Sequence, residues 1–271
     1  NAVGPGAPAY KSYDSSGFQY SGYLYLAPVT FTTATGTVST IPIRVLAVYS
    51  SACAAGASGC SSAPDPNTFH YMGSGFDRNT ASPAAPLVSP TDSALLNIAT
   101  DGSGAYAAGY VVSASGVTVG ATVSTVSGFS LSPLSASTGV PGDWNEALGT
   151  VAITESGASP SFQPAQVLVD TGITEMIVDQ PTSLFPSGPP ADSTVAVTVN
   201  GASSTPALSY SYSSGPAGGG SPTAVGSAPS SLSLIKTSGA TVLSVNTGRH
   251  PLFDVDYLFD ATTGAVGFSP L

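Results

Sequence analysis

The sequence Val167-Leu168-Val169-Asp170-Thr171-Gly172-Ile173-Thr174 joins an apolar, β-branched run to an Asp-Thr-Gly turn. The apolar run predicts a buried β-strand, and the strand would place the Asp170 carboxylate at its end. Thr171 is small and can hold the loop by its hydroxyl, while Gly172 lets the backbone turn sharply. Asp170, Thr171 and Gly172 are therefore the candidate functional residues. A tripeptide of this kind also occurs by chance, so its value as evidence for a functional site depends on the rest of the chain.

A second segment of the chain is similar to the one that ends in Asp170. Residues 29–48 (VTFTTATGTVSTIPIRVLAV) align without gaps on residues 151–170 (VAITESGASPSFQPAQVLVD). Pro42 then matches Pro164, and each copy reads as strand, polar turn, strand. A duplicated unit at this spacing predicts two similar β lobes, related by a pseudo-two-fold axis, with a cleft between them.

The C-terminal segment 242–268, VLSVNTGRHPLFDVDYLFDATTGAVGF, adds a second motif. Together with the Asp-Thr-Gly loop it resembles the pepsin-like aspartic peptidases. In that family a glycine behind the active-site loop precedes a helical turn, a strand ending in Phe-Asp and a final Val-Gly-Phe. Here these are Gly248, Phe259-Asp260 and 266–268. Weaker counterparts are FHYMGSGFDRN (69–79), with Gly73 in the equivalent place, and GYVVSASGVTVG (109–120), which resembles bacterial members.

The resemblance covers roughly residues 23–271 and implies an all-β, bilobal, pepsin-like double β-barrel. The expected organisation is an extended N-terminal arm over 1–22, a first lobe over 23–140 and a second lobe over 141–271. Composition supports the all-β class independently, because Ser, Thr, Gly, Pro and Val dominate and helix formers are sparse. Hairpins are predicted over 110–119 and 195–212, and one short helix over 93–99.

The first lobe departs from the family pattern. The gapless repeat puts Val48 opposite Asp170, and a one-residue gap would put Tyr49 there instead. Ala34-Thr35-Gly36 would read Asp-Thr-Gly only if Ala34 were an aspartate, and the repeat places it in a hairpin turn. The interval between Val48 and Gly73 is also too short for the β-hairpin flap that normally closes over the substrate.

These departures bear on the chemistry that the family performs. Aspartic peptidases hold a water between two carboxylates that share one proton, one acting as base and the other as acid. Asp170, Thr171 and Gly172 would supply one half of such a site. The candidate second acid is Asp77, for which a surface turn formed with Arg78 is the alternative interpretation. His250, Asp254 and Asp256 lie in the closing segment without a recognisable catalytic partner.

Charge and composition exclude other classes of function. The 271 residues carry a net charge of −10 and only 7% charged residues, so nucleic acid is not an expected partner. No apolar run is long enough to span a bilayer. His70 and His250, the only histidines, are not in ligand-spaced positions, and we expect no metal and no cofactor.

Cys53 and Cys60 lie close together in the sequence, which predicts a local disulfide and an oxidising compartment. The chain begins in a polar Gly/Pro-rich stretch, as a mature secreted protein would, so we expect it outside the cell or at the cell surface. The leading hypothesis is a non-peptidase homologue that acts in binding, inhibition or surface assembly, with a protein, a peptide or a second copy of the chain as partner. The alternative is an acid-active aspartic endopeptidase that pairs Asp170 with a carboxylate from elsewhere in the chain or from a second chain.

Overall fold

A computed structural model describes residues 6–13, 17–33, 36–54, 60, 62, 65–68, 76, 87, 89–100, 105–180, 192–214, 228–236 and 242–271. Its strands and short 3-10 helices divide between two compact units. Unit 1 comprises residues 1–72, 78–108 and 137–143, and unit 2 comprises residues 73–77, 109–136 and 144–271. Among the described residues there is no α-helix, which is consistent with the all-β class that the composition predicted.

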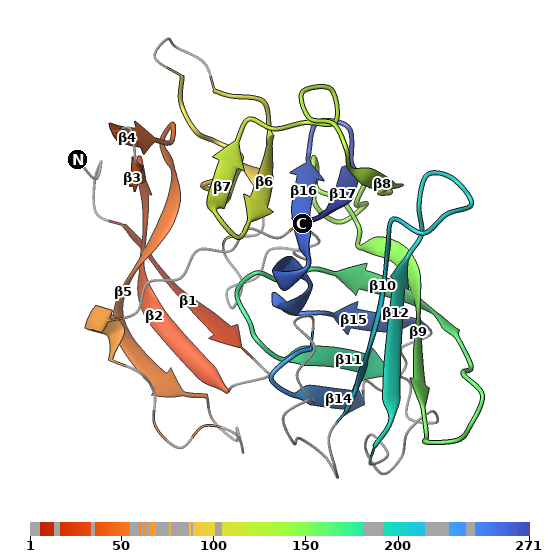
Figure 1. Ribbon diagram of the computed structural model, residues 1–271. Helices are drawn as coiled ribbons and strands as arrows, with labels where there is room; N and C mark the ends of the chain where they lie inside the picture. The colour runs from red at the N-terminus through yellow and green to blue at the C-terminus, as the bar shows by residue number, and fades with distance from the viewer. Residues whose placement is uncertain are drawn as a thin grey trace. The chain divides into compact units, whose positions relative to one another are not determined.

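Unit 1 is built on a three-stranded antiparallel sheet in the order β1-β2-β5 (Figure 1). Its strands are β1 (Ala7–Tyr13), β2 (Phe18–Ala27) and β5 (Ile43–Cys53). A separate hairpin, β3 (Thr30–Thr33) with β4 (Gly36–Ser39), lies between β2 and β5 in the sequence. β1 pairs with β2 along its whole length, so the segment expected as an extended arm contributes β1 and the first half of β2 to this sheet.

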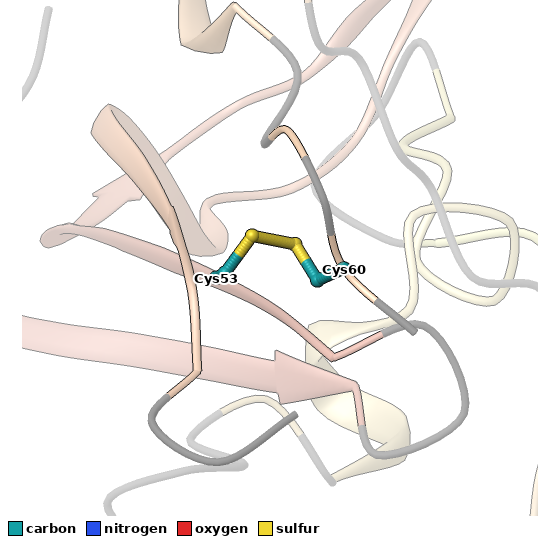
Figure 2. The surroundings of a disulfide bond; sticks show 2 residues. All are labelled: Cys53 and Cys60. Carbon is teal, nitrogen blue, oxygen red and sulfur yellow. A yellow bond between two sulfur atoms is a disulfide. The ribbon is translucent and has the colours of Figure 1, made fainter. Parts of the chain in front are cut away.

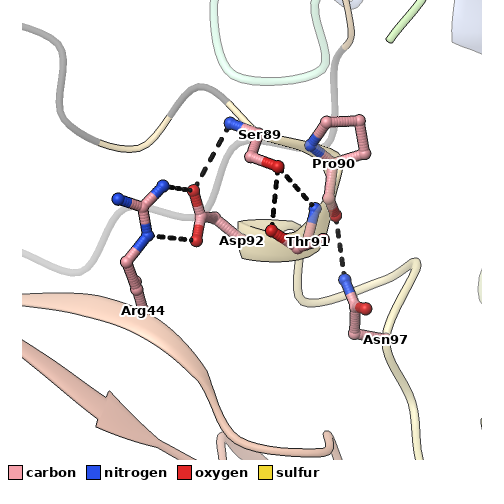
Figure 3. A network of polar contacts seen from close by, with 6 residues as sticks. All are labelled: Arg44, Ser89, Pro90, Thr91, Asp92 and Asn97. Carbon is pink, nitrogen blue, oxygen red and sulfur yellow. Dashed lines mark hydrogen bonds and ion pairs between the residues drawn. The ribbon is translucent and has the colours of Figure 1, made fainter. Parts of the chain in front are cut away.

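A polar network ties β5 to the 3-10 helix η2 (Pro90–Asp92) within unit 1 (Figure 3). The Arg44 guanidinium donates two hydrogen bonds to the Asp92 carboxylate, Nε to Oδ1 at 2.8 Å and Nη2 to Oδ2 at 2.6 Å. The bond to Asp92 raises the pKa of Arg44 against the opposing effect of its burial. The Ser89 hydroxyl accepts from the Thr91 N–H, and the Ser89 N–H donates to Asp92, which completes a capping box. A forked ion pair therefore fixes this helix against the strand.

The predicted disulfide between Cys53 and Cys60 is confirmed (Figure 2). Cys53 is the last residue of β5, and the two Cα atoms are 5.5 Å apart. The bond closes a short loop immediately after the strand, which restricts the unfolded chain locally.

Unit 2 holds two larger sheets (Figure 1). One has seven strands in the order β13-β12-β9-β10-β15-β11-β14, and the other has five in the order β7-β6-β16-β17-β8. The strands are β6 (Gly109–Ser113), β7 (Gly116–Val119), β8 (Ser130–Pro133), β9 (Ala147–Thr154), β10 (Gln163–Leu168), β11 (Met176–Gln180), β12 (Thr194–Val199), β13 (Leu208–Ser213), β14 (Leu232–Lys236), β15 (Leu243–Asn246), β16 (Val255–Asp260) and β17 (Ala265–Pro270). The hairpins predicted over 110–119 and 195–212 are present as β6–β7 and β12–β13.

The core of unit 2 follows the two-residue period of its strands. On β12, Val195, Val197 and Val199 are fully buried, and the residues between them are half-buried. Phe76 stacks on Phe259 of β16, in the five-stranded sheet, with ring centroids 4.6 Å apart. Asp260 is fully buried at the end of β16, where its carboxylate accepts four hydrogen bonds, from three backbone N–H groups and the Thr263 hydroxyl.

Two predictions of local structure are wrong. The repeat predicted equivalent strand-turn-strand units, but β3 pairs with β4 and β5 pairs with β2, whereas β9 pairs with β10. Strand pairing is a long-range contact that the local apolar pattern does not encode. The expected helix over 93–99 is a turn, because the Asn97 side chain bonds the carbonyls of Pro90 and Ser93 while Ile98 and Ala99 form β-bridges.

The division of the chain also differs in one respect from the boundary expected at residue 140. Residues 109–136 group with unit 2, because β6 pairs with β16 and β8 pairs with β17. The assignment of the two units as pepsin-like lobes stays a prediction.

Candidate functional site

The Asp170 loop crosses the end of a strand in the seven-stranded sheet. β15 lies between β10 and β11, parallel to the first and antiparallel to the second. Leu168, the last residue of β10, pairs with Asn246, the last residue of β15. The connection from β10 to β11, residues 169–175, therefore passes over the C-terminal end of β15. This crossing brings Asp170 next to a segment 76 residues further along the chain.

Hydrogen bonds from two directions hold the Asp170 carboxylate. Oδ1 accepts from the Gly172 N–H at 2.8 Å, within the loop itself. Oδ2 accepts from the Asn246 side-chain amide, Nδ2, at 3.0 Å. Asp170 is half-buried, and Gly172 is exposed. The predicted candidate residues Asp170, Thr171 and Gly172 thus form a tight turn whose carboxylate is oriented by donors from both sides of the crossing.

The residues after Asn246 hold the backbone of the loop. The Thr247 N–H and hydroxyl both donate to the Leu168 carbonyl, at 2.9 and 3.2 Å. The Arg249 N–H donates to the Ile173 carbonyl at 2.9 Å. Gly248 has a φ of +64°, and a Cβ there would overlap the Glu175 carbonyl oxygen. Only glycine fits this position without a backbone shift, which agrees with the expected glycine behind the Asp-Thr-Gly loop.

His250 anchors this segment in the core of unit 2. It begins the 3-10 helix η3 (His250–Phe253), is 1% exposed and packs edge-on against Tyr210 and Tyr212 of β13. Its Nε2 lies 3.0 Å from the Tyr210 hydroxyl, and its buried Nδ1 has no partner in hydrogen-bond geometry. Burial lowers the pKa of His250 to about 4, against smaller opposing effects of the Thr247 backbone and Asp254. The imidazole is therefore a neutral core group at physiological pH.

The predicted counterpart of Asp170 in unit 1 lies in a strand. Val48 pairs with Gly22 of β2, and Ser50 pairs with Ser21, so Tyr49 is the extra residue of a β-bulge in β5. Tyr49 is 61% exposed, and its ring lies 5.4 Å from that of Tyr23. At neither aligned position does β5 end in a turn like the one at Asp170.

Several other predicted positions lie outside the described residues: His70, Gly73, Asp77 and Ala34. The neighbours of Ala34-Thr35 are described, and Thr33 pairs with Gly36 across the β3–β4 hairpin. Asp254 and Asp256 are described, at the end of η3 and on β16. Within the described part of the chain, no group of three or more His, Cys, Asp or Glu side chains could hold a metal ion. In the same residues, no helix is long and apolar enough to cross a membrane.

Sequence reasoning missed Asn246. The residue stands at the end of a strand, two positions before the glycine that the sequence did single out. A polar amide directly after the alternation Leu243-Ser244-Val245 was the available signal, since an amide at a strand end commonly bonds nearby backbone groups. Its partner, however, is decided by the strand order of the sheet.

Comparison with known proteins bears on the fold. No family model and no curated protein matches the sequence. Among solved structures, the aspartic proteinase from Irpex lacteus aligns with a TM-score of 0.51 at 12% sequence identity, over 100% of this chain and 82% of that chain. The all-β, bilobal, pepsin-like fold expected from the sequence is thereby confirmed. At this identity the likeness concerns the fold alone.

Proposed function

We propose that this chain is a secreted, non-peptidase protein of pepsin-like fold that binds a protein or peptide. The observation that carries the proposal is the structure at Val48 and Tyr49. Dyad hydrolysis needs an acid and a base on one water, and the two carboxylates act as a unit. β5 pairs antiparallel with the earlier strand β2, as β10 pairs with β9, and the positions of β5 that align with Asp170 hold an apolar residue and a bulged tyrosine. Asp170 would then lack its acid partner.

Other features support parts of this proposal. The disulfide Cys53–Cys60 fits a protein that matures in an oxidising compartment, and hence secretion. A buried His250 that must stay neutral is poorly suited to the acid conditions in which aspartic peptidases work, because its protonation favours unfolding. The sparse, acidic charge favours a protein or peptide partner, including a second copy of the chain, over nucleic acid.

One observation favours the alternative, an acid-active aspartic endopeptidase. The Asp170 loop is intact, and its carboxylate is oriented by the Gly172 N–H and the Asn246 amide. A peptidase of this kind would need a second carboxylate. Asp77 or a carboxylate from a second chain could supply it.

A casein digest between about pH 3 and pH 5 separates the two proposals. We expect no cleavage by the purified chain and no binding of pepstatin-type inhibitors, which place a hydroxyl between two carboxylates. Asp170→Asn and Ala34→Asp are the comparison variants. Cleavage that disappears in Asp170→Asn would establish the peptidase. Cleavage that appears only in Ala34→Asp would show that the first active-site loop lies at residues 34–36.

A further inference from the structure

The Asp170 carboxylate and the Asn246 amide belong to one chain of hydrogen bonds. The Gly172 N–H donates to Asp170 Oδ1, and Asn246 Nδ2 donates to Asp170 Oδ2. Asn246 Oδ1 in turn accepts from the Gly248 N–H at 2.9 Å. The two side chains therefore link a backbone N–H of the Asp170 loop to a backbone N–H of the segment that follows β15, with one donor and one acceptor matched at each contact.

An amide is the side chain that this position requires. It needs a donor facing Asp170 and an acceptor facing the Gly248 N–H, and an asparagine provides both on one planar group. A carboxylate would lose the donor and a hydrocarbon would lose both. Hydrogen bonds to a charged group are the stronger class, so the bond to Asp170 is the larger contribution of the two.

The backbone holds Asn246 at a fixed place. The residue pairs with Leu168 of β10 on one side and with Ile177 of β11 on the other. Thr247 and Arg249 bond the carbonyls that precede and follow Asp170, at Leu168 and Ile173. The fixed backbone and the bond from the Gly248 N–H to Asn246 Oδ1 together hold the amide in place, so that its Nδ2 can orient the carboxylate.

We infer that Asn246 is the positioning residue of Asp170: its amide sets the orientation of the carboxylate and joins the Asp-Thr-Gly loop to the end of β15. The inference is independent of the proposed function, since it holds whether Asp170 binds a ligand or takes part in catalysis. It also explains why the chain has an aspartate at position 170 without a recognisable second active-site loop. The Asp170–Asn246 pair stabilises the place where the β10–β11 connection passes over the end of β15.

Exchanging the two side chains tests this inference. In the variant Asp170→Asn/Asn246→Asp, the new amide at 170 can donate to the new carboxylate at 246, and the Gly172 and Gly248 N–H groups both keep an acceptor. The single substitutions instead leave two like groups facing each other, two amides in Asp170→Asn and two carboxylates in Asn246→Asp. Asn246→Leu removes the amide altogether, and Asn200→Asp, at an exposed position in the same unit, controls for the added charge.

Urea unfolding of the full chain, followed by tryptophan fluorescence, gives the readout. Trp144 is the only tryptophan and lies in unit 2, where its Nε1 donates to the Ala261 carbonyl, so its emission reports this unit. At pH 7 we expect each single substitution at 170 or 246 to raise the unfolding constant about 10- to 100-fold. The exchanged pair should return to within about fivefold of the parent.

The pH dependence adds a readout that loss of packing would not move. Asn246→Asp places two carboxylates together, and like charges at this distance cannot both ionise without cost. Relative to the parent at each pH, its destabilisation should therefore shrink between about pH 7 and pH 4.5. The destabilisation of Asn246→Leu should shrink less in this range, because that variant leaves a single carboxylate without a charged neighbour. An exchanged pair as unstable as the sum of its single variants would overturn the inference, as would equal behaviour of Asn246→Asp and Asn200→Asp.

Discussion

His250 should make unit 2 lose stability as the pH falls from about 6.5 to about 4. The imidazole is 1% exposed and packs edge-on against the rings of Tyr210 and Tyr212. Burial lowers the pKa of His250 to about 4, whereas an unfolded histidine titrates near 6.5. Between these two values the unfolded chain binds more protons than the folded chain. The stabilising effect of the neutral imidazole is thus complete above about pH 6.5 and lost as the pH falls to about 4.

The size of this effect follows from the difference between the two pKa values. Each unit of difference corresponds to about 1.4 kcal/mol, so the free energy of unfolding should fall by about 3 kcal/mol across the window. That is a large part of the roughly 5–15 kcal/mol by which domains are typically stable. Other groups also titrate on acidification, and the diagnostic quantity is therefore the difference in slope between the parent and a variant without this imidazole.

Urea unfolding at about pH 7, 6, 5 and 4, followed by the fluorescence of Trp144, measures that difference. We expect His250→Gln to be less stable than the parent at pH 7, because its packing against Tyr210 and Tyr212 changes, yet to lose about 3 kcal/mol less on acidification. His70→Gln, which removes the only other histidine of the sequence, is the matched control. Parallel curves for the parent and His250→Gln would refute the reasoning.

Two further substitutions test polar contacts within each unit. Asp260→Asn should lower the free energy of unfolding of unit 2 by about 3 kcal/mol, because an amide donor replaces an oxygen that accepts N–H groups. Asp256→Asn, on the same strand, changes a carboxylate whose buried Oδ1 has no partner, and it should lower the same free energy by under about 1 kcal/mol. Urea unfolding followed by tryptophan fluorescence measures both. Arg44→Gln should destabilise unit 1 by about 1 kcal/mol and speed amide hydrogen exchange in η2. Arg44→Lys should have an intermediate effect, since lysine keeps the charge but cannot form both hydrogen bonds to the Asp92 carboxylate. Unchanged exchange in both variants would contradict the role of the Arg44–Asp92 pair.

Much of the class of this protein could be predicted from patterns within a few residues. Alternating Val, Thr and Tyr predicted the hairpins β6–β7 and β12–β13, whose strands are adjacent in the chain. The resemblance to pepsin-like peptidases implied Gly248 behind the Asp170 loop, and the structure gives its reason, a positive φ against the backbone of the loop. The disulfide between Cys53 and Cys60 was equally local. For the hairpins and the disulfide, the partners lie close enough in the sequence for chemistry and spacing to specify the contact.

The error in the repeat fell where partners are distant. Residues 29–48 were aligned with residues 151–170 on local pattern, but β5 pairs with β2, and an inserted hairpin separates them in the chain. The pattern of a strand shows which face is buried and does not show which neighbour completes its hydrogen bonds.

By itself, the sequence determined an all-β chain with an Asp-Thr-Gly turn after an apolar strand, because turn chemistry and side-chain alternation are local properties. Only the tertiary structure decided what that turn contacts. Asn246 meets Asp170 because β15 lies between β10 and β11, and the order of strands in a sheet is set by the burial of whole faces. The same order carries His250 into a core lined by Tyr210 and Tyr212, where desolvation turns an ordinary histidine into an acid-sensitive one.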